Sequence, residues 1–191
     1  MRVELLKSAE NIVLSPETDT QYVLIPTGLV NVEMQMETSD VSAELIALYS
    51  LKDSNEVTLS TKSIHAVPNT TCMVNVKVAL FDSSRSNYEG RIIIKKPAQQ
   101  TVSYLEDNVL IIGEKIKNHS QPILEIEADD VKASHGATSG RIDELQIYYL
   151  MSRGLTRIES EKIIIEGFFE AALSKIQNDE VKAQALKELY V

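Results

Sequence analysis

The sequence contains one cysteine, Cys72, and no tryptophan among its 191 residues. A single thiol cannot close an intrachain disulfide, which is typical of proteins from a reducing cytosol. The chain also lacks any run of eighteen apolar residues, and its first residues have no long apolar core. These absences predict a cytoplasmic protein with neither a membrane span nor a signal peptide.

Positive charge is also scarce. Lys and Arg together number 19, whereas Asp and Glu number 28, which gives a formal charge of -9 at pH 7. Because contacts to a phosphate backbone need clustered Lys and Arg, this composition argues against nucleic-acid binding. The length suits one domain, or one domain with a small appendage, and is sufficient to bury a core without disulfides.

The common signatures of phosphate binding and nucleophilic catalysis are incomplete. Gly136 and Gly140 precede a predicted helix, but no lysine follows in the register of a phosphate loop. A plain strand-to-helix turn is therefore favoured over an anion site. Cys72 begins an alternating segment, which predicts a half-buried structural thiol rather than a nucleophile. No Gly-x-Ser-x-Gly elbow is present.

Metal ligands are few. His65, His119 and His135 lie far apart in the sequence, and no two of them share a helix face, which argues against a zinc site within one chain. From spacing alone, His135 is interpreted as a hydrogen-bonded structural residue. An iron–sulfur site usually needs several thiolates, so a cluster would have to be shared between chains. Without a complete active site, a scaffold or interaction protein is favoured over an enzyme.

Alternating polarity dominates residues 1–134. In VNVEMQME, residues 30–37, Val and Met alternate with polar residues, and similar alternation occurs in residues 73–80 and 122–128. This is the period of a strand with one buried face. No helical pattern separates these segments, so a sandwich, a barrel and a parallel β-helix all stay open. No strict repeat is visible, so a β-helix would have to be irregular.

Helical periodicity begins near residue 141. Ile142, Leu145 and Tyr149 follow a 3.6-residue period. Thr156 and Glu159 form a capping-box pattern that predicts the start of a second helix. The expected inward stripe of this helix consists of Ile158, Ile165, Phe169, Leu173 and Ile176. A third helix is expected after the QNDE segment, with an inward face of Val181, Ala185 and Leu189.

One segment resembles a known family. LEIEADDVKASHGATSGRIDELQIYYLMSRGL, residues 124–155, closely resembles the C-terminal signature of the SufB/SufD family of iron–sulfur cluster assembly proteins. A looser similarity extends over about residues 63–176. The resemblance implies a mainly β fold with an α appendage, in which a right-handed parallel β-helix over residues 1–138 precedes a small helical domain over residues 139–191.

The same resemblance implies a scaffold or accessory subunit of a SUF-type iron–sulfur cluster assembly complex, and not an enzyme. Such a subunit would pair through the β-helix with a SufB/SufD-type subunit, as a homodimer or a heterodimer. A SufC-like ABC ATPase would dock on the helical domain. The single chain would hold no cofactor stably, and a transient iron–sulfur cluster would be shared between subunits.

The resemblance assigns a role to His135. This residue matches the histidine at the heterodimer interface of SufD-type subunits, which implies a shared cluster ligand, and hence a metal ligand, at this position. Other positions depart from the family pattern. By ungapped alignment on the histidine, the acceptor cysteine of SufB-type subunits falls at Asp107, and a glutamate falls at Gly136. Ala133 stands where SufD-type subunits often have cysteine. These departures imply a SufD-like chain.

The helical domain carries the residues expected to bind the ATPase partner, which are Tyr148, Tyr149, Arg153 and Phe168. Exposed aromatic and Arg side chains are favoured interface anchors, whereas Phe169 is expected to pack in the helical core.

Two alternatives stay open. A degenerate family member would only dimerise. A β-helix carbohydrate-active enzyme would need paired carboxylates, for which Asp129 and Asp130 are the candidates. Adjacent strand residues point to opposite faces, so these two side chains are not expected to converge.

Overall fold

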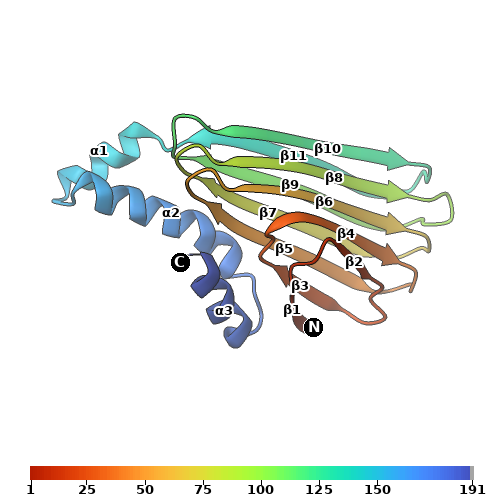
Figure 1. The fold of residues 1–191 in the computed structure, drawn as a ribbon. Coiled ribbons are helices and arrows are strands. Elements are labelled where there is room, and N and C mark those ends of the chain that lie inside the picture. Colours follow the sequence, from red (N-terminus) through yellow and green to blue (C-terminus); the bar gives the residue numbers. More distant parts are fainter. Residues whose placement is uncertain (190–191) are drawn as a thin grey trace.

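The computed structural model describes residues 1–189, in which a long series of strands precedes a helical region (Figure 1). The strands are β1 (Arg2–Leu6), β2 (Asn11–Leu14), β3 (Thr20–Leu24), β4 (Gly28–Met36), β5 (Ser42–Leu51), β6 (Glu56–His65), β7 (Thr71–Leu80), β8 (Arg85–Ile94), β9 (Thr101–Ile111), β10 (Lys117–Ile126) and β11 (Val131–Arg141). The helices are α1 (Glu144–Ser152), α2 (Arg157–Leu173) and α3 (Asp179–Leu189). None of the described helices is long and apolar enough to cross a membrane.

Consecutive strands alternate between two parallel sheets. Sheet A has the order β1-β3-β5-β7-β9-β11, and sheet B has the order β10-β8-β6-β4-β2. The chain therefore winds as a parallel β-helix, which confirms the predicted fold and excludes a sandwich or a barrel. Successive turns differ in length, as the pairing of Ser42 with Thr71 and of Thr71 with Val102 shows. The β-helix is thus irregular, as the absence of a sequence repeat predicted.

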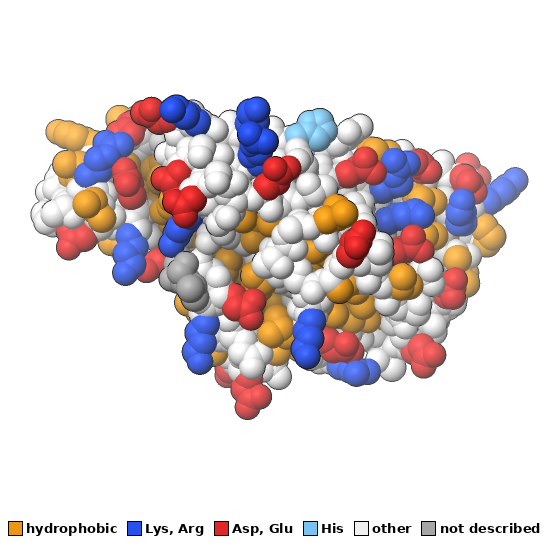
Figure 2. Space-filling view, viewed as in Figure 1, with side chains coloured by type: hydrophobic (Ala, Val, Ile, Leu, Met, Phe, Trp, Pro, Cys, Tyr) orange, Lys and Arg blue, Asp and Glu red, His pale blue; other side chains and the backbone are white. Residues whose placement is uncertain are grey.

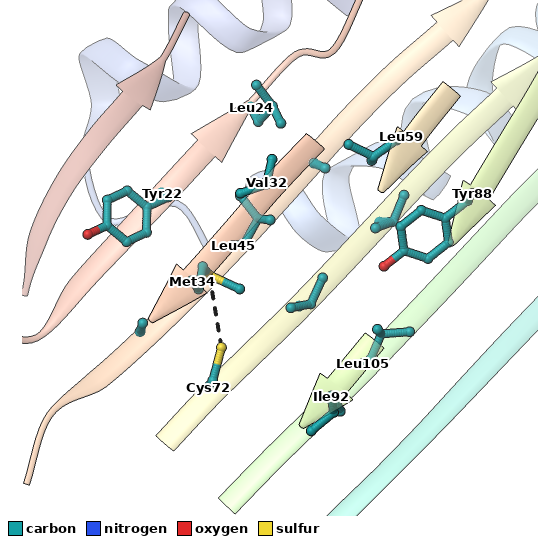
Figure 3. Packing of buried hydrophobic residues seen from close by; sticks show 14 of the residues in the cluster. Tyr22, Leu24, Val32, Met34, Leu45, Leu59, Cys72, Tyr88, Ile92 and Leu105 are labelled. Carbon is teal, nitrogen blue, oxygen red and sulfur yellow. Dashed lines mark hydrogen bonds between the residues drawn. The ribbon is translucent and has the colours of Figure 1, made fainter. Parts of the chain in front are cut away.

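The inward faces of the two sheets form the main hydrophobic core (Figure 3). Along β4, Val30, Val32, Met34 and Met36 point inward and are at most 2% exposed. Leu45 and other side chains of sheet A pack in the same cluster. Burying each of these side chains stabilises the fold by about 1.5–3 kcal/mol. The alternation in the sequence thus correctly predicted which residues of this strand face the core.

Gly90 lies on the inward face of β8, where a larger residue has no room. A Cβ atom there would come closer than van der Waals contact to Leu105 and to the Tyr88 hydroxyl. We expect Gly90→Ala to lower the free energy of unfolding by about 1–3 kcal/mol, the usual cost of overpacking a core. Urea denaturation measures this change.

Gly167→Ala is the matched control for that substitution. This glycine lies within α2, and a Cβ atom there would meet nothing within 4 Å. The substitution should raise the free energy of unfolding by up to about 1 kcal/mol, because alanine is the better helix former. Equal effects of the two substitutions would contradict the packing around Gly90.

The helices α2 and α3 cover the part of the outward face of sheet A that is formed by β1, β3, β5 and β7. Val23, Ile46 and Leu48 project from this face into a second cluster. The buried members that α2, α3 and the segment between them contribute to the cluster are Phe169, Ala172, Leu173, Ile176, Ala185 and Leu189. Phe169 is fully buried, which confirms its predicted place in the helical core.

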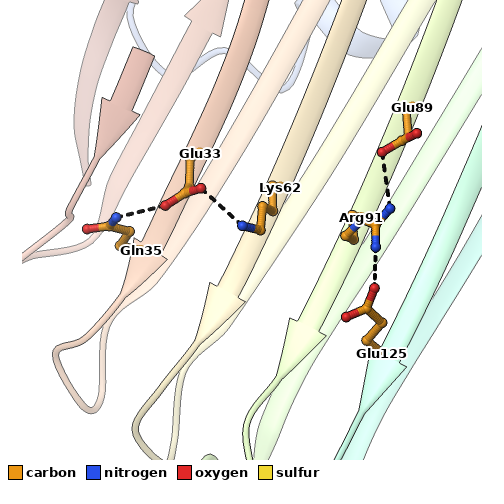
Figure 4. A network of polar contacts seen from close by, with 6 residues as sticks. All are labelled: Glu33, Gln35, Lys62, Glu89, Arg91 and Glu125. Carbon is orange, nitrogen blue, oxygen red and sulfur yellow. Dashed lines mark hydrogen bonds and ion pairs between the residues drawn. The ribbon is translucent and has the colours of Figure 1, made fainter. Parts of the chain in front are cut away.

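The outward face of sheet B is polar and carries a ladder of opposite charges (Figure 4). Lys62 Nζ lies 3.2 Å from Glu33 Oε2 on the neighbouring strand. Arg91 binds Glu89 at 3.3 Å and also binds Glu125 of β10. Exposed ion pairs contribute little to stability because solvent screens them. Their effect is to keep this face hydrated, in contrast to the helix-covered face of sheet A.

The helical region differs from the prediction in which residues it buries. α1 buries Ile147 and leaves Leu145 and Tyr149 exposed, and Ile158 at the start of α2 is also exposed. The predicted inward stripe of α2 is therefore wrong at Ile158, and the helical period of Leu145 and Tyr149 does not correspond to a buried face. α1 and the first turns of α2 project beyond the sheets (Figure 1), so within the described residues much of their apolar surface finds no partner.

The start of α2 is as predicted. Thr156 Oγ1 accepts a hydrogen bond from the Glu159 N–H at 3.3 Å, and the Glu159 carboxylate accepts one from the Thr156 N–H at 2.7 Å. The hydrogen bond from the Thr156 backbone lowers the pKa of Glu159. Arg157 binds the Glu144 carboxylate through both terminal nitrogens, at 2.9 and 2.7 Å. This bidentate pair orients α1 relative to α2.

The segment around Gly136 and Gly140 is a strand and not the predicted turn. β11 runs from Val131 to Arg141 and pairs with β9 along its whole length. The β-helix therefore continues past residue 138, where the domain boundary was predicted. The small residues of β11 show no alternation because most of its side chains are exposed, so neither face needs to be apolar.

Candidate functional site at the last turn of the β-helix

The β-helix ends in two strands that each have one unpaired edge. Within the described residues, β11 pairs only with β9, and β10 pairs only with β8. β11 is 11 residues long, and most of its side chains are exposed. The free N–H and C=O groups of a long edge strand are able to pair with a strand of another chain. The last turn therefore has the form of a pairing surface.

Apolar side chains are partly uncovered at this edge. Leu124 of β10, together with Val131 and Ala133 of β11, packs on the main core but is only partly buried. Ile126 of β10 is 44% exposed. In the interior of the β-helix such residues are covered by the following turn. A second chain placed on this edge would cover them in the same way.

His135 lies on the inward face of β11 and is exposed. It pairs in register with Leu105 of β9, which points into the core, so the two residues share a face of sheet A. Its neighbours on that face are the small residues Ala133 and Ala137. The imidazole is therefore accessible at the open end of the β-helix, where a group bound by another chain would meet it.

Asp107 lies beneath this edge on the inward face of β9. Its side chain is fully buried, and Ser120 Oγ of β10 donates to Asp107 Oδ2 at 2.5 Å. Burial raises the pKa of Asp107 to about 6, against the opposing effect of the Ser120 hydrogen bond. Asp107 pairs in register with Ala137, two residues from His135 on the same face. The position that aligns with an acceptor cysteine thus carries a buried carboxyl group.

His65 and Cys72 are not part of this site. The ring nitrogens of His65 lie 2.7 Å from Thr70 Oγ1 and 3.1 Å from Ser103 Oγ, and burial lowers its pKa to about 4. Cys72 is fully buried, beyond the half-burial predicted, and burial raises its pKa to about 12. Among the described residues, no group of three His, Cys, Asp or Glu side chains is arranged to hold a metal ion.

The helical residues predicted to bind a partner fall into two groups. Tyr148 and Tyr149 are 72% and 57% exposed, and the Arg153 guanidinium lies 5.2 Å from the centre of the Tyr149 ring. Phe168 is half-buried instead. Lys77 Nζ of β7 lies 4.3 Å from the centre of its ring, so Phe168 helps to hold α2 on sheet A.

Sequence reasoning missed Leu145 as a surface residue. Leu145 is 75% exposed and shares one face of α1 with Tyr148 and Tyr149, because residues three and four apart are neighbours on a helix. These three residues form the α1 patch, at the end of the molecule where hydrophobic side chains gather in Figure 2. The adjacent tyrosines could have predicted this exposure. With Tyr148 and Tyr149 side by side, α1 carries apolar side chains around more of its circumference than a single contact with the core can bury.

The last turn and α1 both lie within a segment that matches a known family model. The model describes the SufBD core domain of SUF system FeS cluster assembly, and it matches residues 27–168. The chain belongs to this SufBD family. The resemblance seen in the sequence is therefore confirmed, and it extends upstream to the start of β4.

Several relatives of this SufBD chain are known by name. Iron-sulfur cluster assembly protein SufD of Bacillus subtilis (strain 168) is 39% identical over 103 residues, which are 54% of this chain and 24% of the relative. The SufD protein of Escherichia coli (strain K12) is 36% identical over 113 residues, which are 59% of this chain and 27% of the relative. A SufBD family protein of Mycobacterium leprae is 27% identical over 191 residues, covering 94% of this chain and 49% of the relative. The chain thus spans less than half the length of these relatives.

The carboxylate pair considered for a carbohydrate-active enzyme lies near the same edge. Asp129 and Asp130 occupy the turn between β10 and β11, and not a strand. Asp130 accepts a hydrogen bond from the Gln100 side chain, and its backbone N–H donates to Gln99 Oε1 at 2.9 Å. These bonds hold the turn against the preceding one.

Proposed function

We propose that this SufBD chain is a scaffold subunit of a SUF-type iron–sulfur cluster assembly complex and that it is not an enzyme. The observation that carries the proposal is the open last turn, where His135 is accessible on β11, a long strand with one unpaired edge. The family match supports the proposal because the matched segment contains both this turn and α1.

The first partner is a second SufB/SufD-type subunit that pairs through β10 and β11. Strand addition would satisfy the free backbone groups of β11. It would also remove Leu124 and Ile126 from water, which favours association. An identical subunit and a related subunit both offer an edge of this kind, so the pair is either a homodimer or a heterodimer.

The iron–sulfur cluster is the cargo of the complex. His135 would supply one imidazole ligand, since histidine replaces cysteine on iron in some clusters. The sole cysteine is fully buried in the core, so the thiolates would come from the partner. The cluster is then shared and transient, and the single chain holds no cofactor stably.

The second partner is a SufC-like ABC ATPase that docks on the α1 patch. Leu145, Tyr148 and Tyr149 offer an apolar and aromatic face, and Arg153 lies beside Tyr149. Aromatic and Arg side chains dominate the binding energy of many interfaces. The Arg157–Glu144 pair ties α1 to α2. Movement of an ATPase bound to the α1 patch would therefore be transmitted to α2, which packs on sheet A.

Removal of the α1 patch tests this docking surface. We expect the double variant Leu145→Ala/Tyr148→Ala to bind the cognate ATPase about tenfold more weakly or worse, because two exposed anchors are lost. Isothermal titration calorimetry with the full-length chain gives the affinity. Val13→Ala is the matched control, since Val13 is 62% exposed on β2, far from α1 in the fold. No association of the parent protein with the ATPase under any nucleotide condition would overturn the proposal.

One observation favours a second candidate, a SufBD protein that pairs but no longer assembles clusters. The position aligned with an acceptor cysteine is the buried Asp107, and the residue after His135 is a glycine. The pairing edge would then be retained without cluster chemistry. Substitution of His135 separates the two candidates, because only a protein that assembles clusters needs the imidazole.

A further inference from the structure

Two buried oxygen atoms of the last turn have no hydrogen-bond donor. Within the described residues they are Asp107 Oδ1 of β9 and Asn118 Oδ1 of β10. The Asp107 side chain is 0% exposed. Unpaired acceptors are rare in protein interiors because each one loses its hydrogen bonds to water. Two of them in the same turn indicate a missing positive charge or donor.

The two oxygen atoms lie on facing strands of the same turn. Asn118 and Ser120 occupy the same face of β10, two residues apart, and Ser120 Oγ donates to Asp107 Oδ2 at 2.5 Å. The Asn118 amide also lies 3.4 Å from Ser139 Oγ of β11. Oxygen atoms from β9, β10 and β11 therefore gather in the interior of the open turn.

Within residues 1–189, no side chain forms an ion pair that would supply a counter-charge to this carboxylate. The titratable side chains that point inward around it are Tyr49 of β5, Tyr88 of β8 and His135 of β11. The Tyr49 hydroxyl contacts Ser86 and the Tyr88 hydroxyl contacts Thr61. No ion pair to Asp107 is present among the described residues. An isolated buried carboxylate is costly, so a bound cation would relieve it.

We propose that the last turn binds one sodium-sized monovalent cation between Asp107 Oδ1 and Asn118 Oδ1. Oxygen-only donors select hard cations and not the softer metals that prefer nitrogen or sulfur. A single carboxylate balances a single positive charge, whereas a divalent ion would leave an uncompensated charge in a buried turn. The Ser120 hydroxyl binds the other carboxylate oxygen, Asp107 Oδ2, and Ser139 Oγ accepts from the Asn118 side-chain nitrogen, so both Oδ1 atoms stay available to the ion.

Bound there, the cation links β9 to β10, whose side chains supply the two unpaired oxygen atoms, and it lies next to β11, where Ser139 contacts Asn118. The site stabilises the edge that the proposed partner subunit would use. It does not depend on cluster assembly, so it stands whether or not the proposed function is correct.

Thermal unfolding of the full-length chain at pH 8 tests the site. The melting temperature is measured in sodium, potassium and choline chloride at equal ionic strength. We expect a saturable increase of about 2–4 °C in sodium over choline, the size expected for roughly 1 kcal/mol of binding in a chain of this length. Asp107→Asn, which keeps the shape and removes the charge, should abolish the difference.

A second variant changes the ion that the site prefers. Asn118→Asp would face two carboxylates toward each other, so we expect Mn²⁺ or Ca²⁺ to raise its melting temperature and to have no such effect on the parent. Destabilisation of this variant without rescue by a divalent ion would overturn the placement of Asn118.

Three other outcomes would overturn the proposal. Equal melting temperatures of the parent in sodium and choline would mean that a proton alone neutralises Asp107. A sodium effect that persists in Asp107→Asn would place the ion elsewhere. A larger effect of divalent ions than of sodium on the parent would make the monovalent assignment wrong.

Discussion

Asp107→Asn is expected to raise the free energy of unfolding by about 3 kcal/mol at pH 8 in a buffer whose only cation is choline. Burial raises the pKa of the native carboxyl from 3.8 to about 6, and each unit of difference between the native and unfolded proteins is about 1.4 kcal/mol. Asparagine has nearly the same shape and no charge to desolvate. Its carbonyl oxygen still accepts the Ser120 hydrogen bond.

The stabilisation by Asp107→Asn should increase as the pH rises, because the penalty for burying the carboxylate of the parent protein increases. Below about pH 3 the carboxyl group is protonated in both the native and the unfolded protein, so it does not penalise folding. As the pH rises from about 4 to about 6, the unfolded chain loses its proton first, and the stability of the native protein falls. Above about pH 7 both states are ionised and the loss is complete.

Urea denaturation of the parent and the variant over a series of pH values measures this difference. The free-energy difference between them should grow from near zero at about pH 3 to its full value by about pH 7. Asp129→Asn is the control, because it changes the net charge equally at an exposed position in the turn before β11. A difference that stays constant with pH would contradict a buried titrating group at Asp107.

His135→Ala is expected to reduce the yield of iron–sulfur cluster on the paired subunits by about tenfold or more. Loss of partners outside the first coordination shell already costs 10–100-fold in metal affinity or activity at many sites, and a direct ligand should matter at least as much. Anaerobic reconstitution with the partner subunit, followed by iron and sulfide analysis, gives the yield. Pairing itself should persist, because the backbone of β11 is unchanged.

His119→Ala is the matched control for this experiment. His119 is also exposed, but it lies on β10 of sheet B, where its Nε2 is 3.4 Å from Gln121 Oε1 of the same strand. Its removal should leave the cluster yield unchanged. An unaltered yield in His135→Ala would support the alternative in which the chain pairs without assembling clusters. Loss of pairing in His135→Ala would instead assign the imidazole a structural role at the edge.

Local patterns in the sequence were sufficient where neighbouring residues decide the outcome. The alternation from Val30 to Met36 predicts the buried face of β4, because successive side chains of a strand point to opposite sides. Thr156 and Glu159 predict the start of α2, because the hydrogen bonds of a capping box close within four residues. The signature from residue 124 to 155 was enough to identify the family.

Only the tertiary structure decided which faces of the strands and helices are buried against other parts of the chain. Leu145 has the spacing of a core residue, yet it is exposed because α1 projects beyond the sheets. Gly136 and Gly140 belong to a strand because β9 offers its edge to them, which no local pattern records. Asp107 is buried because β10 closes over it, although its charge predicts exposure. Periodicity states which residues share a face, but burial depends on segments that are distant in the sequence, and these are placed only when the β-helix has wound.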